Sequence, residues 1–120
     1  MSSNEVILYV DDEKLARDFY AVVLETQPTL DVPGMVEFDL GGTTLGLMPT
    51  RDIVDLVPGL TAGSGQRCEL YLRRQNAQDW LDRITHAGGR LVSPLAPRSW
   101  GESVGYALDL DGHVLAIAEA

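Results

Sequence analysis

Two segments of the chain carry a carboxylate and a phenol at matching places. Glu5 and Tyr9 lie in one apolar run, and Glu69 and Tyr71 lie in another. Both runs are typical of β-strands, in which side chains alternate between two faces, so each glutamate shares a face with its tyrosine. A carboxylate can bind a cation, hold a metal ion or accept a proton, and a tyrosine adds stacking surface. We therefore take these residues as candidate binding residues.

The elements around the first pair are predicted by hydrophobic periodicity and turn residues. Alternation predicts a strand over Glu5–Val10, and apolar residues at helical spacing predict a helix from Asp12, its N-cap, to about Glu25. Its apolar stripe is Leu15, Phe19, Val22 and Val23. Strands are predicted at about Met35–Leu40 and Thr43–Met48, joined by a glycine pair that suits a tight hairpin.

The same order of elements returns in the second half of the chain. A strand at Cys68–Leu72 precedes a helix that begins at Asn76 with a capping-box-like Asp79, has the stripe Trp80, Leu81, Ile84 and Ala87, and ends at Gly88-Gly89. Strands follow at about Arg90–Ser93, Ser103–Leu108 and His113–Ala118. Repetition of one unit predicts a single domain over 1–120, with unit one at about 4–50 and unit two at about 67–120. Residues 49–66 form the joint, with a short helix near Asp52–Val57.

Alternation also predicts which side chains face a ligand. The apolar faces of the strands, with Cys68 as a buried thiol, suit the helices, whereas Glu5, Tyr9, Glu69 and Tyr71 face away from them. The last strand of each unit adds Met48 and two very small residues, Gly46 and Ala116, to the second face. If the units pair with their helices outside, these second faces line a central cleft, and Trp100 supplies further stacking surface. Packing alone is the competing explanation for each of these side chains.

Composition restricts the partners. Nine basic and eighteen acidic residues give a net charge of −9, which repels nucleic acid and anionic lipid and attracts cationic molecules or metal ions. We expect no membrane partner, because no apolar run reaches the length of a membrane span. The single cysteine, Cys68, cannot form a disulfide within the chain, and this favours a reducing compartment such as the cytoplasm.

These patterns together resemble a known superfamily. The carriers of the resemblance are the passage Leu8-Tyr9-Val10-Asp11-Asp12 with Phe19-Tyr20, the helix end Ala87-Gly88-Gly89, Trp100-Gly101, and Asp109-Leu110-Asp111-Gly112-His113-Val114. They are similar to the glyoxalase, bleomycin-resistance and extradiol dioxygenase proteins, also called vicinal oxygen chelate proteins. The resemblance implies an α+β fold of two tandem βαβββ units, whose curled mixed sheets surround a central cleft with the helices outside. It also implies a homodimer.

Enzymes of this group hold a divalent metal through His, Gln or Glu on the first strand of each unit and Glu on the last. The resemblance places these positions on Glu5, Glu69, Gly46 and Ala116, so half of the expected ligands are missing. His86 and His113 fall on none of the ligand positions. A catalytic transition metal usually has three or more protein ligands. We therefore expect no resident cofactor, with a divalent metal at Glu5 and Glu69 as the alternative.

Three functions follow as hypotheses. The first is a protein that binds a small organic molecule, with a cationic one favoured by charge, through Glu5, Tyr9, Met48, Glu69, Tyr71, Trp100 and Ala116. The second is a metal-dependent lyase, isomerase or dioxygenase of the glyoxalase type that uses Glu5 and Glu69, or a metal-free variant in which neighbouring carboxylates create a general base. The third is an interaction module that binds no ligand. The sequence identifies no particular substrate and no catalytic residue.

Overall fold

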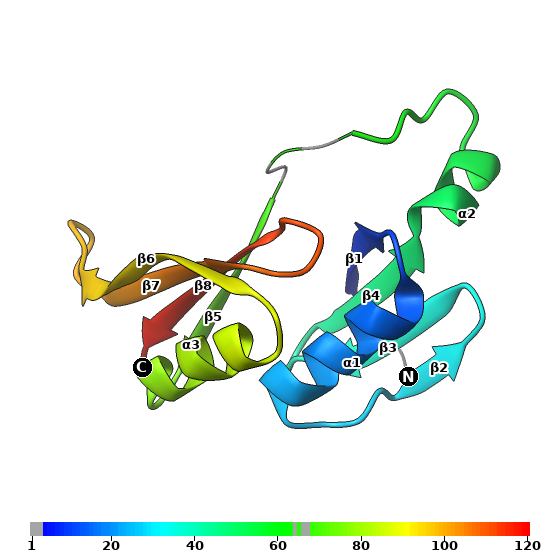
Figure 1. Ribbon diagram of the computed structural model, residues 1–120. Coiled ribbons are helices and arrows are strands. Elements are labelled where there is room, and N and C mark those ends of the chain that lie inside the picture. The colour runs from blue at the N-terminus through cyan, green and yellow to red at the C-terminus, as the bar shows by residue number, and fades with distance from the viewer. Residues whose placement is uncertain (1–3, 64, 66–67) are drawn as a thin grey trace. The chain divides into compact units, whose positions relative to one another are not determined.

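The computed structural model describes residues 4–63, 65 and 68–120, which form an α+β fold with two four-stranded mixed sheets (Figure 1). The chain divides into two compact units, Met1–Ser64 and Gly65–Ala120, and each unit contains one sheet. This division follows the sequence repeat, and the predicted fold class is confirmed. Each unit is described separately below.

The sheet of the first unit is arranged around the last strand of that unit. Its elements are β1 (Glu5–Val10), α1 (Glu13–Leu24), β2 (Leu30–Val32), β3 (Met35–Asp39), β4 (Thr44–Pro49) and α2 (Thr50–Leu56). The strand order is β1-β4-β3-β2; β1 runs parallel to β4, and the other neighbours are antiparallel. The central strand β4 therefore has β1 on one side and β3 on the other.

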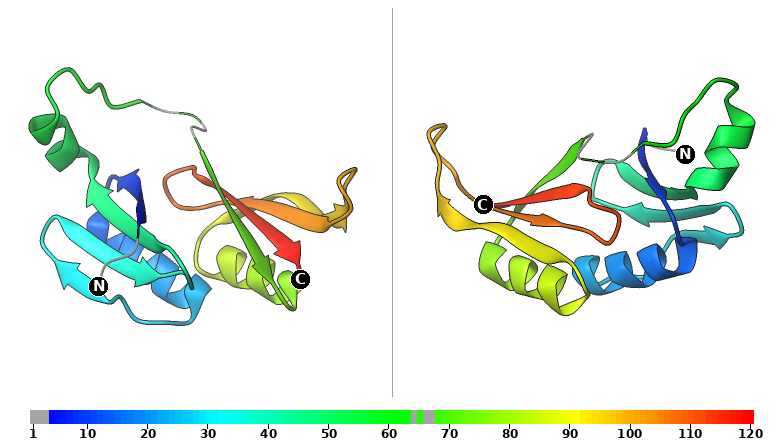
Figure 2. Two further views of the ribbon diagram at one scale, coloured as in Figure 1. Left: turned by 180° about the vertical axis from the view of Figure 1, so that it is seen from behind. Right: turned by 45° about the horizontal axis from the view of Figure 1, so that its top comes forward.

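The second unit repeats this topology. Its elements are β5 (Glu69–Arg74), α3 (Ala77–His86), β6 (Arg90–Pro97), β7 (Ser103–Leu108) and β8 (Val114–Glu119). The strand order is β5-β8-β7-β6, with β5 parallel to β8. In both units a helix follows the first strand and packs on one face of the sheet (Figure 2). Each sheet thus has one face covered by α1 or α3 and an opposite face, called the helix-free face because neither of these two helices covers it.

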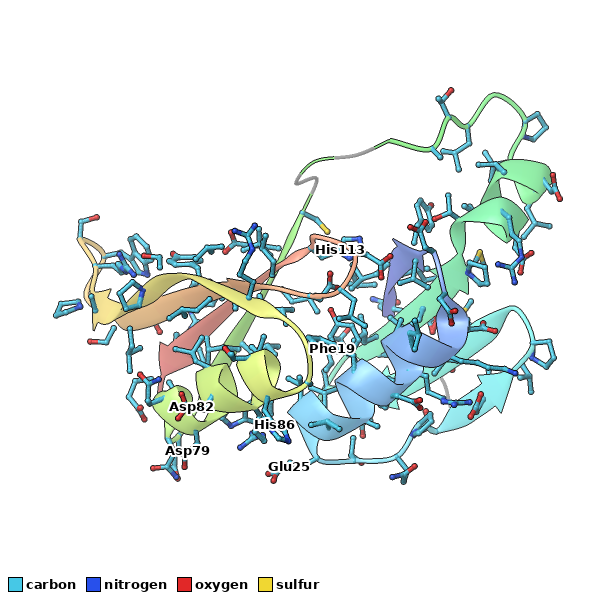
Figure 3. The ribbon with its side chains drawn as sticks, viewed as in Figure 1. Phe19, Glu25, Asp79, Asp82, His86 and His113 are labelled. Atoms are coloured by element: carbon cyan, nitrogen blue, oxygen red, sulfur yellow. The ribbon has the colours of Figure 1, made fainter. Side chains whose placement is uncertain are left out.

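The core of unit one lies between α1 and the covered face of its sheet. Phe19, Tyr20 and Val23 are buried on α1, and Phe19 lies on the helix side that faces the strands (Figure 3). They pack in a core with the inward-facing strand residues Leu8, Val10, Val36, Phe38, Leu45 and Leu47, all at most 2% exposed. Burial was predicted correctly for Phe19 and Val23. It was predicted wrongly for Leu15 and Val22, which are exposed. Tyr20 and Ala16 are buried instead, because a 100° rotation per residue brings them onto the inner side.

Three local predictions differ from the structure. Strand β2 was not expected, because it has three exposed residues between prolines and pairs only through β3. Cys68 precedes β5 and is exposed, so the prediction of a buried thiol is wrong. Trp80, expected in the buried stripe of α3, is half-buried and lies under the guanidinium groups of Arg74 and Arg83, 5.1 and 4.5 Å from the ring centroid.

The N-terminus of α3 is capped from another element. Asn76 precedes the helix but has left-handed backbone angles (φ 57°, ψ 51°) and makes no side-chain capping bond, so the expected capping box does not form. The Glu119 carboxylate at the end of β8 accepts the N–H groups of Asn76 and Ala77 at 3.0 and 2.9 Å. A negative charge at this end also complements the helix dipole. The cap therefore depends on the folded sheet.

Both predicted hairpin turns are present. Gly41 and Gly42 adopt φ values of 84° and 122°, which side-chain-bearing residues rarely reach, and Gly112 adopts 86°. The second hairpin is held by the buried Asp109 carboxylate, which accepts the backbone N–H of His113 at 2.8 Å and lies 2.9 Å from its Nδ1. His113 is thus a buried part of the turn. None of the described helices is long and apolar enough to cross a membrane.

Candidate functional site

The helix-free face of unit one collects the predicted residues of that unit. Strand β1 contributes Glu5, Ile7 and Tyr9, and pairing in register places Ile7 beside Gly46 and Tyr9 beside Met48 on β4. On the other side of β4, Glu37 of β3 also pairs with Gly46. No side chain projects from Gly46, so the two glutamates approach each other across it.

The space above Gly46 is occupied by the side chain of Glu5. A Cβ atom placed on Gly46 would lie 3.2 Å from both the carboxyl carbon and Oε1 of Glu5, and 3.1 Å from Cγ1 of Ile7. Glycine therefore permits the carboxyl group to fold over the central strand towards Glu37. The sequence pattern predicted Glu5 and Gly46 on this face, whereas Glu37 was not predicted.

The two carboxyl groups share a proton. Hydrogen bonding to Glu37, followed by partial desolvation and the negative charge of Glu37, raises the pKa of Glu5 from its ordinary 4.5 to about 7. Glu5 therefore keeps its proton to a higher pH than an ordinary glutamate and can donate it to the carboxyl group of Glu37. Such a group can act as a hydrogen-bond donor, as a proton acceptor or, after losing its proton, as part of a cation site.

These donors do not fit the metal site that the fold family implies. At the last-strand position Gly46 offers no ligand atom, and the nearest carboxyl group, that of Glu5, has a raised pKa, so a metal would have to compete with a proton for it. Within residues 4–63, 65 and 68–120, no three His, Cys, Asp or Glu side chains are grouped to hold a metal ion. The described residues of unit one provide a carboxyl pair in place of a metal-ligand set.

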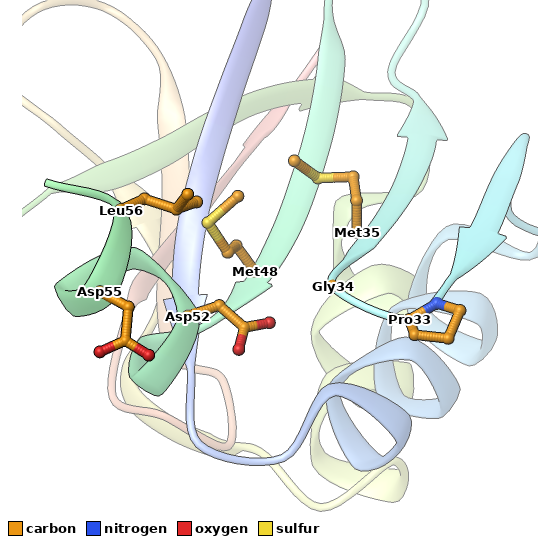
Figure 4. Close-up of a pocket in the computed structure, with 7 residues that line it drawn as sticks. All are labelled: Pro33, Gly34, Met35, Met48, Asp52, Asp55 and Leu56. Carbon is orange, nitrogen blue, oxygen red and sulfur yellow. The ribbon is translucent and has the colours of Figure 1, made fainter.

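A pocket lies on unit one between the sheet and α2 (Figure 4). Its volume is ≈ 440 Å³, within the usual range for small-molecule sites. It is lined by Pro33, Gly34, Met35, Met48, Asp52, Asp55 and Leu56. Met48, a predicted ligand contact, is therefore a pocket residue, and it is the cross-strand neighbour of Tyr9.

The helix-free face of unit two carries a hydrogen-bonded network around Tyr71. The Tyr71 hydroxyl donates to Oε1 of Glu102 at 2.5 Å and accepts from Nε1 of Trp100 at 2.9 Å. Arg73 donates to Oε2 of Glu102 at 2.8 Å and lies over the Tyr71 ring. The bonds from Arg73 and then Tyr71 lower the pKa of Glu102, whereas the bond to Glu102 raises the pKa of Tyr71. Tyr71 and Trp100 thus lie together, as a binding surface requires.

The other predicted residues of unit two lie apart from this network or under it. Ala116 is fully buried in a cluster with Val104 and Ala118, and Tyr71 and Tyr106 pack against that cluster. The space left by this alanine is thus occupied by tyrosine. Glu69 is exposed at the start of β5. His86 is exposed at the end of α3 (Figure 3), as expected from its position there.

Three functional candidates were missed in the sequence. Glu37 alternates with buried Val36 and Phe38, a signal that it faces away from α1, but its approach to Glu5 depends on strand pairing. Glu102 lies in the β6–β7 hairpin, and Asp52 on a short helix in the joint. Nothing in the local pattern of either residue indicates its contacts.

Comparison with known proteins places this geometry in a family. A family model described as a glyoxalase-like domain matches residues 3–120. A search of curated proteins finds no match. A glyoxalase-related enzyme from Fulvimarina pelagi is 22% identical, with a TM-score of 0.86 over 100% of this chain and 88% of its own.

A second solved structure shares the fold at lower identity. A glyoxalase/bleomycin resistance protein/dioxygenase family enzyme from Burkholderia phytofirmans PsJN is 17% identical, with a TM-score of 0.87 over 99% of this chain and 98% of its own. At such identities the similarity to solved structures supports the fold alone. Together with the family model, which spans nearly the whole sequence, it leads to one conclusion: the chain belongs to the glyoxalase-like domain family.

Proposed function

We propose that this protein binds a small organic molecule on the helix-free faces of its sheets, without a complete metal site. The observation that carries the proposal is the open pocket of ≈ 440 Å³ beside Met48 on the helix-free face of unit one. Ligand sites are concave and mostly apolar, with a few polar groups that set orientation. The two methionines and Leu56 supply the apolar part here.

The predicted contacts divide between the units. In unit one Glu5, Tyr9 and Met48 belong to one strand pair, so that one ligand can touch a carboxyl group, a phenol ring and a thioether. In unit two Tyr71 and Trp100 are hydrogen-bonded to each other and present aromatic surface, with Glu69 as a further candidate, whereas Ala116 is buried beneath the tyrosines. A net charge of −9 favours a cationic or hydrogen-bond-donating ligand.

A thermal-shift screen tests the proposal. Basic aromatic amines, neutral aromatic alcohols and aromatic carboxylates of matched size are added to the purified full chain. A compound that binds only the folded state raises the melting temperature, by several degrees at about one hundred times its Kd. If no compound of any charge raises it, the small-molecule proposal fails and the interaction-module hypothesis is favoured.

An enzyme is the second candidate, and the Glu5–Glu37 pair favours it. A carboxyl group with a pKa near 7 suits general acid–base catalysis at neutral pH, so a metal-free isomerase or lyase could use Glu5 as its base. The metal-dependent alternative through Glu5 and Glu69 is tested by elemental analysis of the purified protein before and after chelator treatment. Stoichiometric zinc, nickel, manganese or iron that the chelator removes would favour the metalloenzyme.

A further inference from the structure

The pocket on unit one combines an apolar wall with acidic groups. Figure 4 shows Met48 and Leu56 directed towards one another from β4 and α2, while Met35 comes from β3. Leu56 is 67% exposed, so its apolar side chain is accessible to a ligand in the pocket. Unbranched methionine side chains adapt to ligands of irregular shape. An apolar body of modest size therefore has matching surface here.

The charged groups of the pocket lining are all acidic. Asp52 and Asp55 project from α2, and Figure 4 shows the Asp52 carboxylate on the side nearest Gly34, with that of Asp55 at the outer end. A Cβ atom placed on Gly34 would lie 3.5 Å from Oδ2 of Asp52, so this carboxylate lies directly against the turn between β2 and β3. At this turn, the Asp52 carboxylate is therefore the charged group available to bind a cation in the pocket.

An unsatisfied carboxylate oxygen lies behind the same turn. Oε1 of Glu13 accepts the Gly34 N–H at 3.3 Å, whereas its Oε2 is buried and has no hydrogen-bond partner within the described part of the chain. A buried carboxylate oxygen without a donor is costly, and native proteins rarely leave one so. The turn at Gly34 therefore has carboxylates on two sides, from Glu13 and Asp52, and their combined charge is not balanced by any basic residue of the pocket lining.

We propose that this pocket binds a small organic cation, with the apolar body against Met35, Met48 and Leu56 and the N–H donors on the Asp52 carboxylate. The inference rests on the proposed small-molecule function, for which it assigns the ligand class and the site. A charge-assisted hydrogen bond to Asp52 provides orientation, and the thioether and leucine surface provides the hydrophobic gain. An anion of the same shape is rejected by both aspartates.

The test uses three probes that share a naphthalene ring and differ in the charge of the attached polar group: 2-naphthylmethylammonium, 2-naphthylmethanol and 2-naphthoate. Each is titrated into the full chain with ¹³C-labelled methionine methyl groups, and Met35→Leu and Met48→Leu variants assign the signals. We expect the ammonium probe to shift the Met35 and Met48 methyl signals with at least tenfold higher affinity than the alcohol. We expect the carboxylate to bind more weakly than either.

Three variants locate the interaction. Asp52→Asn should weaken binding of the ammonium probe about tenfold or more and leave the alcohol unchanged, because it removes a charge at constant shape. Asp82→Asn makes the same change in net charge on α3, where an amide can keep the bond with Gln78, and should have less than a twofold effect. Leu56→Ser, at an exposed position, should weaken the ammonium and the alcohol alike.

Several results would overturn the inference. Equal losses in Asp52→Asn and Asp82→Asn would mean that the overall field alone attracts the cation. Equal affinity for ammonium and alcohol would remove the role of charge. Binding that leaves both methionine signals unshifted would place the ligand elsewhere and would leave the broader small-molecule proposal intact. Unchanged melting temperatures of the variants confirm that they fold.

Discussion

At the scale of single residues, the functional character of unit one depends on a glycine. Gly46 lets Glu5 lie over the central strand, where its carboxyl group meets Glu37 from the opposite neighbour. Two carboxyl groups so placed cannot both ionise easily, and the pKa of Glu5 rises to about 7. A carboxyl group that exchanges protons near neutral pH needs a raised pKa, and a neighbouring carboxyl group is one way to raise it.

Removing the carboxyl group of Glu37 should lower the pKa of Glu5. In Glu37→Gln the neutral amide cannot repel the Glu5 carboxylate, so we expect the pKa of Glu5 to fall from about 7 towards 4.5. A ¹³C carboxyl NMR titration measures it, with the Glu5 signal assigned through Glu5→Gln. Glu25→Gln, at the end of α1, makes the same charge change and should leave the Glu5 titration as it is. A Glu5 pKa that stays near 7 in Glu37→Gln would refute the pairing.

The same pair gives stability a defined pH dependence. Because the pKa of Glu5 is higher in the folded state, the folded chain holds more protons than the unfolded chain between pH 4.5 and about 7. The contribution of Glu5 to the free energy of unfolding is complete below pH 4.5 and is lost as the pH rises through about 7. Solvent screening limits the contribution to about 1 kcal/mol. Urea unfolding across this range should show the loss in the wild type and a much smaller one in Glu37→Gln.

At the scale of elements, α3 lies close to its sheet because β7 has a glycine under the helix. A Cβ atom placed on Gly105 would lie 2.4 Å from Cδ1 of Leu81 and 3.2 Å from the backbone nitrogen of Leu95. Leu81 is buried, and Leu95 lies in β6 between Ser93 and Ala96, which both pair with β7. The close approach of helix and sheet thus leaves no room for a methyl group.

Gly105→Ala should therefore destabilise the protein by about 1–3 kcal/mol, the usual cost of overpacking a core. Urea unfolding followed by circular dichroism measures the change. Gly63→Ala is the control, because a Cβ atom there would have open space and the backbone has no positive φ. If both variants unfold at the same urea concentration, the proposed packing of Leu81 against β7 is wrong.

The cap of α3 gives a second prediction at this scale. Glu119 accepts the backbone N–H groups of Asn76, just before the helix, and of Ala77, its first residue, and Asn76 makes no side-chain capping bond. Glu119→Ala should lower the free energy of unfolding by about 1 kcal/mol, as loss of an N-terminal cap usually does. Glu119→Gln should keep part of this stability, since its amide oxygen can still accept one bond. An alanine variant as stable as the wild type would contradict the assignment of Glu119 as the cap.

At the scale of the whole molecule, the net charge of −9 should influence ligand binding through its long-range field. Raising the ionic strength from 0.01 to 0.15 M shortens the Debye length from about 30 to about 8 Å. We expect the affinity for 2-naphthylmethylammonium to fall several-fold over this range, while that for 2-naphthylmethanol stays constant. Calorimetric titration at both salt concentrations measures it. Salt dependence of the same size for both probes would show that the field has no role.

The sequence by itself determined the architecture of each unit. Alternation along Glu5–Val10, helical spacing before Gly88-Gly89 and the two glycine hairpins are local signals, because they depend on residues a few positions apart. Such signals predicted the doubled α+β fold, and they predicted that Glu5, Tyr9 and Tyr71 lie on the sheet face away from the helices. They failed at β2, at Cys68 and at the cap of α3, where a few exposed residues carry little pattern.

Only the tertiary structure decided which polar groups meet. Glu37 reaches Glu5 because both strands pair with β4 in one register, and Glu102 of the β6–β7 hairpin reaches Tyr71 of β5 although β8 lies between β7 and β5 in the sheet. The pocket exists because α2 follows β4 and brings Asp52 close to Gly34 in the β2–β3 turn. These contacts join residues far apart in the chain, and register is set by the packing of whole sheets. Local pattern therefore identifies the face on which a side chain lies, whereas its chemical partner depends on the assembled sheet.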